Sequence, residues 1–296
     1  MSHVAAMDTL GLPIDTAACF STVQNKFSKR VMKRQMKTLR PLVPLLRQFL
    51  EPDETILLAT RGSSPLSTLE KFGGGLMHYT KRCALVVTNK RILHIPTRLS
   101  YLPKKSIAQV LYGDIAVAKP RAVLSRALTL TYKSGKQETF SNLARGEFKK
   151  LKALLGRRPT EGAMSEARQR QHLCPKCMSP LRQNIYECSV CRLEFKNPQQ
   201  AVRRSLLVPG GGWFYAGHPM LGTLYALVEV ALLVEIILIV TGILTGQGEA
   251  EAWAPVIYVL FVFGLEKLLA IHHIKRAMDE YIPASEEFVS IKTYAR

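Results

Sequence analysis

The sequence is poor in acidic residues. It has 22 Asp and Glu against 41 Lys and Arg in 296 residues, a formal net charge of +19. The deficit lies before residue 206, where 36 basic residues stand against 13 acidic ones, whereas residues 206–296 carry 5 and 9. A cationic body favours an anionic partner, either membrane headgroups or nucleic-acid phosphates. Solubility combined with a membrane-topology signal is the alternative explanation.

The sequence also lacks a secretory leader and the motifs of common catalytic sites. Residues 1–20 have no continuous apolar core behind a basic start, so they do not predict a cleaved signal. No nucleophile–base pair, Walker-type loop or pair of catalytic carboxylates occurs at a usable spacing. Aromatic residues are not interleaved with the basic runs, which weighs against a nucleic-acid stacking platform. We therefore expect a protein that is not an enzyme.

Two long apolar runs near the carboxyl terminus, 223–245 and 254–274, are the strongest architectural signal. Each has about the 20 residues that a helix needs to cross a bilayer, and only helices satisfy their own backbone there. The link 246–253 has two Glu and no Lys or Arg, whereas basic residues flank the outer ends. The positive-inside rule then places both termini in the cytoplasm. The prediction is an inner-membrane protein with a hairpin at 223–274 and a cytoplasmic tail at 275–296.

Three ionisable residues stand out inside the predicted spans: Glu229, Glu235 and Lys267. Glu229 and Lys267 lie at nearly equal depth, counted at about 1.5 Å per residue, so we expect an ion pair between antiparallel helices. Glu235 falls near mid-bilayer, where an acid costs about 2.5–3.5 kcal/mol on insertion scales. It is either neutral, in contact with a second copy of the chain in a homo-oligomer, or part of an ion path. A channel or transporter subunit is therefore one alternative function.

Two segments beside the domains are also distinctive. Residues 1–50 form a basic helical region in which apolar residues recur at steps of three and four. Such a helix suits an anionic membrane, a neighbouring domain with its basic face solvated, or, as a third alternative, nucleic acid. Residues 199–222 are rich in Gly and contain Trp213, Phe214 and Tyr215, which suit the headgroup zone. We expect an interfacial or re-entrant entry to the first span there.

Residues 51–156 change to short β-rich runs and end in an apolar-periodic helix at 145–155. Hairpins are expected around Asn89–Lys90 and around 133–136. Several short strands closed by one helix predict a small barrel or sandwich. With the helical segments, this gives an α+β fold class for the chain.

The run Leu-Val-Val-Thr-Asn-Lys-Arg-Ile-Leu at 85–93 is followed by a strand at 106–110 and a Thr-Leu-Thr-Tyr-Lys-Ser-Gly hairpin at 129–135. This pattern resembles bacterial pleckstrin-homology-like domains. The resemblance implies a domain that binds lipids, peptides or proteins, and it carries over no ligand residue. Basic residues of this segment are candidates for a lipid or partner patch, with scattered solvated charge as the alternative: Lys81, Arg82, Lys90, Arg91, Arg98, Lys104 and Lys105.

Four of the six cysteines form two Cys-x-x-Cys pairs, Cys174 with Cys177 and Cys188 with Cys191, separated by ten residues. Four thiolates at this spacing can converge tetrahedrally on one Zn²⁺. The segment 172–198 resembles a zinc ribbon, and a closed set of four ligands favours a structural ion. Metal binding would supply the folding energy of so short a segment.

These features together predict a non-catalytic, membrane-anchored adaptor. Its pleckstrin-homology-like domain and zinc ribbon, joined by a polar linker at 157–171, would present a surface for anionic lipid or a protein partner at the cytoplasmic face. A membrane-tethered nucleic-acid-binding protein is the second class, supported by the cationic body and the ribbon.

Overall fold

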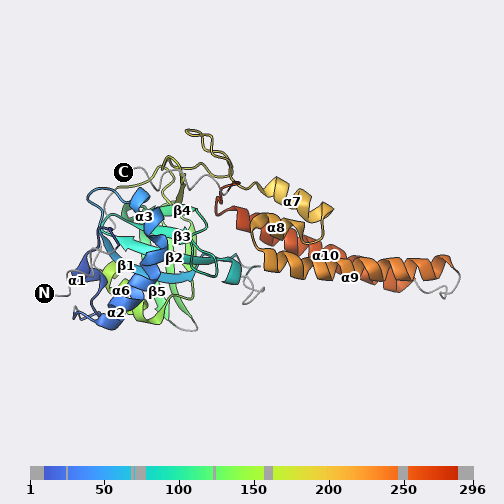
Figure 1. The fold of residues 1–296 in the computed structure, drawn as a ribbon, viewed down its shortest axis with the longest axis horizontal. Helices are drawn as coiled ribbons and strands as arrows, with labels where there is room; N and C mark the ends of the chain where they lie inside the picture. The colour runs from blue at the N-terminus through green and yellow to red at the C-terminus, as the bar shows by residue number, and fades with distance from the viewer. Residues whose placement is uncertain are drawn as a thin grey trace. The chain divides into compact units, whose positions relative to one another are not determined.

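The computed structural model divides the chain into two compact units, residues 1–194 with 285–296, and residues 195–284. Figure 1 shows the elements of both. The structure describes residues 10–24, 26–67, 70, 78–122, 125–156, 163–245 and 253–285. The predicted polar link 246–253 therefore lies almost wholly outside the described residues, as does the second half of the predicted tail, 286–296.

The first unit begins with short helices. Two prolines divide the predicted helical region, because a proline has no N–H to donate and is tolerated in the first turn of a helix. Pro41 opens a 3₁₀ turn and Pro44 opens the helix that follows it. The elements are α1 (Thr16–Cys19), α2 (Lys29–Leu39), η1 (Arg40–Leu42) and α3 (Val43–Phe49).

Two antiparallel sheets follow, with α6 (Arg145–Gly156) after the second, as the sequence predicts for the closing helix. The five-stranded sheet has the order β1-β2-β3-β4-β8, and the three-stranded sheet the order β5-β6-β7. The larger sheet contains β1 (Ile56–Ser63), β2 (Arg82–Thr88), β3 (Arg91–Pro96), β4 (Ile107–Leu111) and β8 (Gln171–Leu173). The smaller one contains β5 (Ile115–Ala122), β6 (Arg126–Tyr132) and β7 (Gln137–Phe140).

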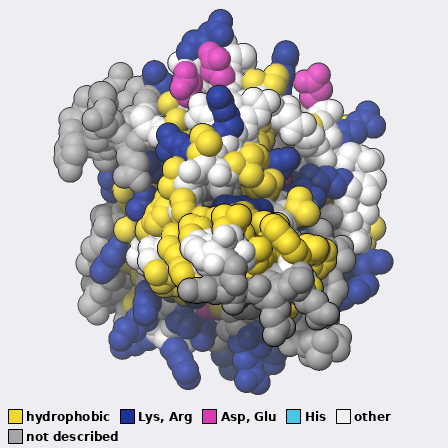
Figure 2. All heavy atoms as spheres, turned by 90° about the vertical axis from the view of Figure 1, so that its right-hand side faces the viewer, with side chains coloured by type: hydrophobic (Ala, Val, Ile, Leu, Met, Phe, Trp, Pro, Cys, Tyr) yellow, Lys and Arg dark blue, Asp and Glu magenta, His cyan; other side chains and the backbone are white. Residues whose placement is uncertain are grey.

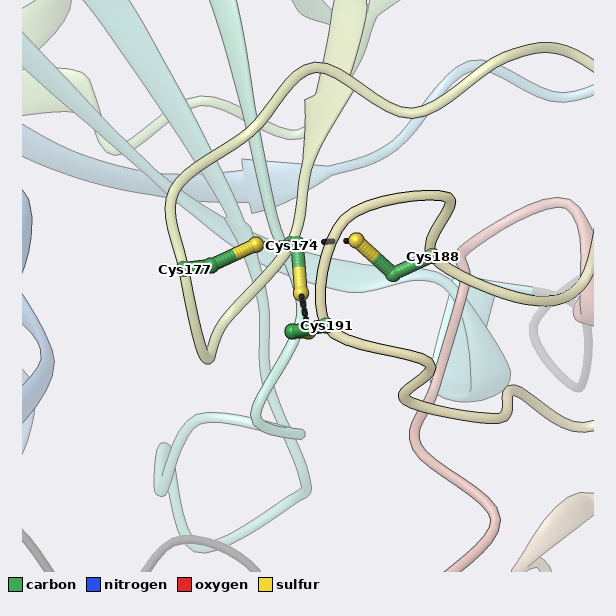
Figure 3. A group of neighbouring side chains, drawn as sticks. All are labelled: Cys174, Cys177, Cys188 and Cys191. Atoms are coloured by element: carbon green, nitrogen blue, oxygen red, sulfur yellow. Dashed lines mark hydrogen bonds between the residues drawn. The ribbon is translucent and has the colours of Figure 1, made fainter.

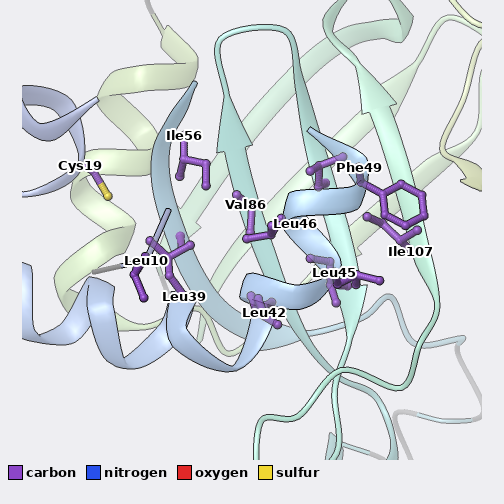
Figure 4. Close-up of a cluster of buried hydrophobic side chains, with 14 of the residues drawn as sticks. Leu10, Cys19, Leu39, Leu42, Leu45, Leu46, Phe49, Ile56, Val86 and Ile107 are labelled. Carbon is purple, nitrogen blue, oxygen red and sulfur yellow. The ribbon is translucent and has the colours of Figure 1, made fainter. Parts of the chain in front are cut away.

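Both faces of the larger sheet are buried, which explains why β2 is a continuous apolar run. Successive side chains of a strand point to opposite faces. Val86 packs with Leu46 and the amino-terminal helices, as Figure 4 shows, whereas its neighbours Leu85 and Val87 pack toward the smaller sheet and α6. Full burial of an aliphatic side chain contributes about 1.5–3 kcal/mol, so both layers are substantial cores.

The second unit is helical: α7 (Pro198–Leu207), α8 (Gly211–Ala216), α9 (Pro219–Leu244) and α10 (Trp253–Met278). Helices α9 and α10 each have 26 residues and are apolar enough to cross a membrane. Only 6% and 17% of their most apolar windows are buried, whereas the core helix of a soluble domain is mostly buried. Figure 2 shows hydrophobic side chains at the exposed end of this pair.

The Gly-rich segment forms a tight helical corner. Gly210 has a φ of 64°, and a Cβ there would overlap the backbone oxygen of Gly222. A Cβ on Gly212 would lie 2.5 Å from Ile274, so α8 packs closely against α10. Trp213, which the sequence suggests for the headgroup zone, is instead 1% exposed, with its ring 5.5 Å from that of Tyr225. Because Gly210 and Gly212 let the neighbouring helices approach closely, the Trp213 indole is buried inside the unit.

Candidate metal centre and charged sites

The cysteine module, residues 174–191, directly follows the last strand of the larger sheet. Strand β8 pairs with β4, placing Leu173 opposite Ile107, and Cys174 is the next residue. The amide of Gln48 donates to the Pro175 carbonyl at 2.7 Å, which attaches the first cysteine loop to α3. The predicted linker 157–171 therefore ends inside the fold, since Gln171 is already part of the sheet.

The two cysteine loops share one backbone geometry. Met178 N–H donates to the Cys174 carbonyl at 2.9 Å, and Arg192 N–H donates to the Cys188 carbonyl at 3.0 Å. Both donors, which directly follow the second cysteine of a pair, have a positive φ, 63° for Met178 and 58° for Arg192. This repeated turn brings both thiols of each pair to the same side of the chain.

The four sulfur atoms converge on one point. Each lies within 4.8 Å of every other, with 3.5 Å from Cys174 to Cys191 and 3.5 Å from Cys177 to Cys188. Figure 3 shows the four thiols pointing toward a common centre. A tetrahedral ion with metal–sulfur bonds of about 2.3 Å needs sulfurs about 3.8 Å apart. The cluster therefore fits a four-coordinate metal, and its soft donors suit Zn²⁺.

One thiol is already disposed to ionise. Burial opposes ionisation of Cys177, but its contacts with Ser179 Oγ at 3.2 Å and with the neighbouring thiols lower its pKa to about 6. The thiolate is the form of cysteine that binds metals.

The Thr-Asn-Lys-Arg turn that carries the family resemblance has a structural role here. Its members tie the β2–β3 hairpin to the segment before β1. Asn89 accepts from Thr55 N–H at 2.9 Å, and Lys90 lies 2.7 Å from Glu51. Arg91 forms two bonds to buried Glu54, at 3.0 and 2.7 Å. Burial opposes ionisation of Glu54, but hydrogen bonds from Arg91 and Thr88 lower its pKa.

The basic residues proposed for a lipid patch divide into buried and surface groups. Lys81, Arg91 and Lys104 are only 6–8% exposed. Lys104 donates to the Thr80 carbonyl at 2.8 Å and Lys81 lies 3.8 Å from Glu70, so these charges act within the domain. The surface group comprises Arg82 and Lys105, which are half-buried, and Lys90 and Arg98, which are exposed.

A buried polar network that sequence reasoning missed lies between the two sheets. Ser64 Oγ is 2.8 Å from His94 Nε2, and Arg170 Nη1 is 3.2 Å from His94 Nδ1. Arg170 also binds Glu138 at 2.8 and 3.1 Å, and the same carboxylate accepts from Tyr132 at 2.8 Å. No local motif marks this network, because its members come from separate strands and from the predicted linker.

The Ser64–His94 pair has the spacing of a nucleophile and its base but the opposite proton arrangement. A guanidinium can only donate, so His94 Nδ1 must accept from Arg170. Burial and the positive charge of Arg170 lower the pKa of His94, so the ring is neutral with its proton on Nε2. That proton is donated to Ser64 Oγ, so the ring nitrogen that faces the hydroxyl cannot remove its proton.

The second unit contains the predicted intramembrane ion pair. Lys267 Nζ lies 2.6 Å from Glu229 Oε2, and Glu229 is 2% exposed. Glu235 is exposed on α9, which leaves its hypotheses of a neutral acid or a second copy open. Sequence reasoning passed over Glu266, whose two carboxylate oxygens are buried without a hydrogen-bond partner among the described residues.

No protein-family model and no curated protein matches the chain. The function must therefore be argued from the geometry of the metal centre, the sheets and the two apolar helices.

Proposed function

We propose that the protein is a non-catalytic adaptor anchored in a cell membrane by α9 and α10. It presents its two-sheet domain and cysteine module to lipid or to a protein partner. The observation that carries this proposal is the exposure of two 26-residue apolar helices, whose surfaces only a bilayer or other apolar partners can cover.

The charge pattern supports a cytoplasmic location for both termini. Arg203 and Arg204 precede α9, and Lys275 and Arg276 fall in the last turn of α10. The segment between the helices has no Lys or Arg. By the positive-inside rule the basic ends stay in the cytoplasm, where thiols remain reduced.

The metal of the proposal is a structural Zn²⁺. Cys174, Cys177, Cys188 and Cys191 would hold it, and four protein ligands leave no open position for a reacting water. The ion would supply stability to a segment, 172–198, that has few large buried apolar side chains of its own: Leu173, Leu181, Leu193 and Phe195.

The binding role rests on the resemblance to bacterial pleckstrin-homology-like domains. Two antiparallel sheets followed by one helix are compatible with that resemblance. Binding in such a domain needs no catalytic group, and the Ser64–His94 pair has its proton in the wrong place for nucleophilic activation.

Membrane extraction tests the anchor. We expect the chain to stay with membranes through alkaline carbonate and to leave with detergent. Protease added outside sealed cells should spare residues 1–205. A chain that stays dissolved without detergent, or whose amino-terminal half is digested from outside, refutes the proposal. Cross-linking and pull-down from native membranes then identify the partner class.

A membrane-tethered nucleic-acid-binding protein is the second candidate, favoured by the exposed Lys and Arg residues of α2, which are Lys29, Arg30, Lys33, Arg34 and Lys37. Phosphate binding releases counterions, so the logarithm of the binding constant for an oligonucleotide must fall linearly with the logarithm of the salt concentration. A salt-dependent shift of the probe, without binding to anionic vesicles, would favour this candidate over the adaptor.

A further inference from the structure

A turn next to α2 carries two apolar side chains that are about half exposed. Thr22 N–H donates to the Lys26 carbonyl at 2.8 Å, and Ser28 N–H donates to the Phe20 carbonyl at 3.1 Å. Val23 is 46% exposed and Phe27 is 47% exposed, although Phe20 beside them is buried in the core. Backbone hydrogen bonds of Thr22, Lys26 and Ser28 therefore flank both exposed side chains.

Helix α2 continues from this turn with a cationic face. At about 100° per residue, its five Lys and Arg fall within a sector of about 140°. They are Lys29, Arg30, Lys33, Arg34 and Lys37, and all are exposed. The opposite face is buried through Gln35, which accepts from Ala59 N–H at 2.8 Å and donates to the Ala59 carbonyl at 2.9 Å. These two bonds to β1 fix which face of the helix is outside.

The cations of α2 are unfavourably placed for the helix itself. Lys29 and Arg30 occupy the first turn, where the helix dipole favours anions, and no acid is present there. Lys33 lies four residues from both Lys29 and Lys37, a spacing at which like charges repel. Of these five cations, only Arg34 has an acidic partner among the described residues, Glu147 at 3.1 Å. An anionic surface laid against this face would relieve both costs.

We propose that the exposed face of α2 and the adjoining turn, together with the exposed side chains of Val23 and Phe27, form a docking surface for anionic lipid headgroups. The cations pair with phosphates, and the two apolar side chains enter the shallow interfacial zone. This inference rests on the proposed function, because α9 and α10 would keep a bilayer at high effective concentration.

Lipid is favoured over nucleic acid by the two exposed apolar side chains, Val23 and Phe27. A nucleic-acid groove needs aromatic rings spaced along the cationic track for the bases to stack on. Here Phe27 is the one aromatic residue in 21–40, and it precedes the cationic helix rather than recurring along it. A cationic helix face that follows one exposed aliphatic and one exposed aromatic side chain matches a headgroup layer over acyl chains.

Hydrogen–deuterium exchange on the full chain in lipid nanodiscs tests the docking. Discs of phosphatidylcholine are compared with discs containing phosphatidylglycerol, with exchange followed in peptides covering residues 20–40. We expect slower exchange of these peptides in the anionic discs and loss of that protection at 1 M salt, where the Debye length is about 3 Å. The triple variant Lys29→Gln, Lys33→Gln, Lys37→Gln should weaken docking roughly 100-fold, at about fivefold per cation.

The matched control is Lys119→Gln, Arg121→Gln, Lys133→Gln, which removes the same charge from exposed positions on and after β5. It should keep the protection, whereas Phe27→Ser should reduce it without changing the salt dependence. Equal exchange in both lipids while the chain stays in the disc refutes the docking and leaves the anchor standing. The docking is also refuted if the two triple variants lose equal protection against exchange in residues 20–40. It is likewise refuted if an oligonucleotide protects these peptides and phosphatidylglycerol does not. A chain that does not enter discs refutes the anchor itself.

Discussion

Lys267 Nζ lies 2.6 Å from Glu229 Oε2 and joins the two apolar helices of the second unit. The ammonium also donates to the Ser205 carbonyl at 2.7 Å, and the carboxylate accepts from Gly210 N–H at 3.1 Å. The pair therefore holds the end of α7 and the corner before α8 as well as α9 and α10. In an apolar setting such satisfied partners are what permit two charges to be buried.

Breaking this pair from one side should be costly. Glu229→Gln or Lys267→Met each leaves one charge buried, a loss of about 3–5 kcal/mol, whereas the double variant should recover much of it. Unfolding of the chain by denaturing detergent in mixed micelles measures the three free energies. Additive losses in the double variant would show that the two side chains do not interact.

The metal centre should bind one Zn²⁺ per chain. Cys188→Ser removes a buried ligand and should abolish stoichiometric zinc, whereas Cys19→Ala, a buried cysteine outside the cluster, should retain it. A colorimetric zinc indicator applied after denaturation measures the metal content. Equal zinc in the two variants would contradict the assignment of the cluster.

Met178→Gly should stabilise the metal-loaded chain. A non-glycine residue in the left-handed region costs about 1–2 kcal/mol of folded-state free energy, which glycine avoids. Glycine also loses more backbone entropy on folding, and this offsets part of the gain. Met178 is half exposed, so little packing is lost. We expect a rise in the thermal midpoint with Met178→Gly and none with Met178→Ala. A lower midpoint for the glycine variant would show that the side chain contributes to the turn.

Two neighbouring residues of the β2–β3 turn should differ sharply on substitution. Arg91→Gln leaves the carboxylate of Glu54, which is 0% exposed, without its cation, and should cost about 3–5 kcal/mol. Lys90→Gln removes a pair that water already solvates and should change the denaturant midpoint little. Urea unfolding of both variants measures the contrast. Equal losses of unfolding free energy would contradict the dominant role of the Arg91–Glu54 pair.

Stability should depend on pH through His94. Burial, followed by the charge of Arg170, lowers the pKa of this ring, so the folded state does not take up the proton that the unfolded chain binds below its ordinary value of about 6.5. Stability must therefore fall as the pH falls through that value, by at most about 1.4 kcal/mol per pH unit. The free-energy difference between the parent and His94→Gln should shrink from pH 8 to pH 5. A constant difference would contradict the buried neutral ring.

The parts of the structure that follow from local chemistry were predictable. Apolar length predicted α9 and α10, cysteine spacing predicted the cluster, and helical depth predicted the Glu229–Lys267 pair. The network of His94, Arg170 and Glu138 was not predictable, since three distant segments meet only after the sheets pack. Burial of Arg91 was missed for the same reason, because its partner Glu54 precedes another strand.

The short strand β8 covers the outer edge of β4 and runs straight into Cys174. Open edges of sheets recruit strands from other molecules, so this cover protects the domain from aggregation. If the cysteine module loses its order when zinc is scarce, β8, which covers the edge of β4, loses its order with it. Metal starvation would then threaten the solubility of the whole two-sheet body, with effects far beyond the loop that loses its ion.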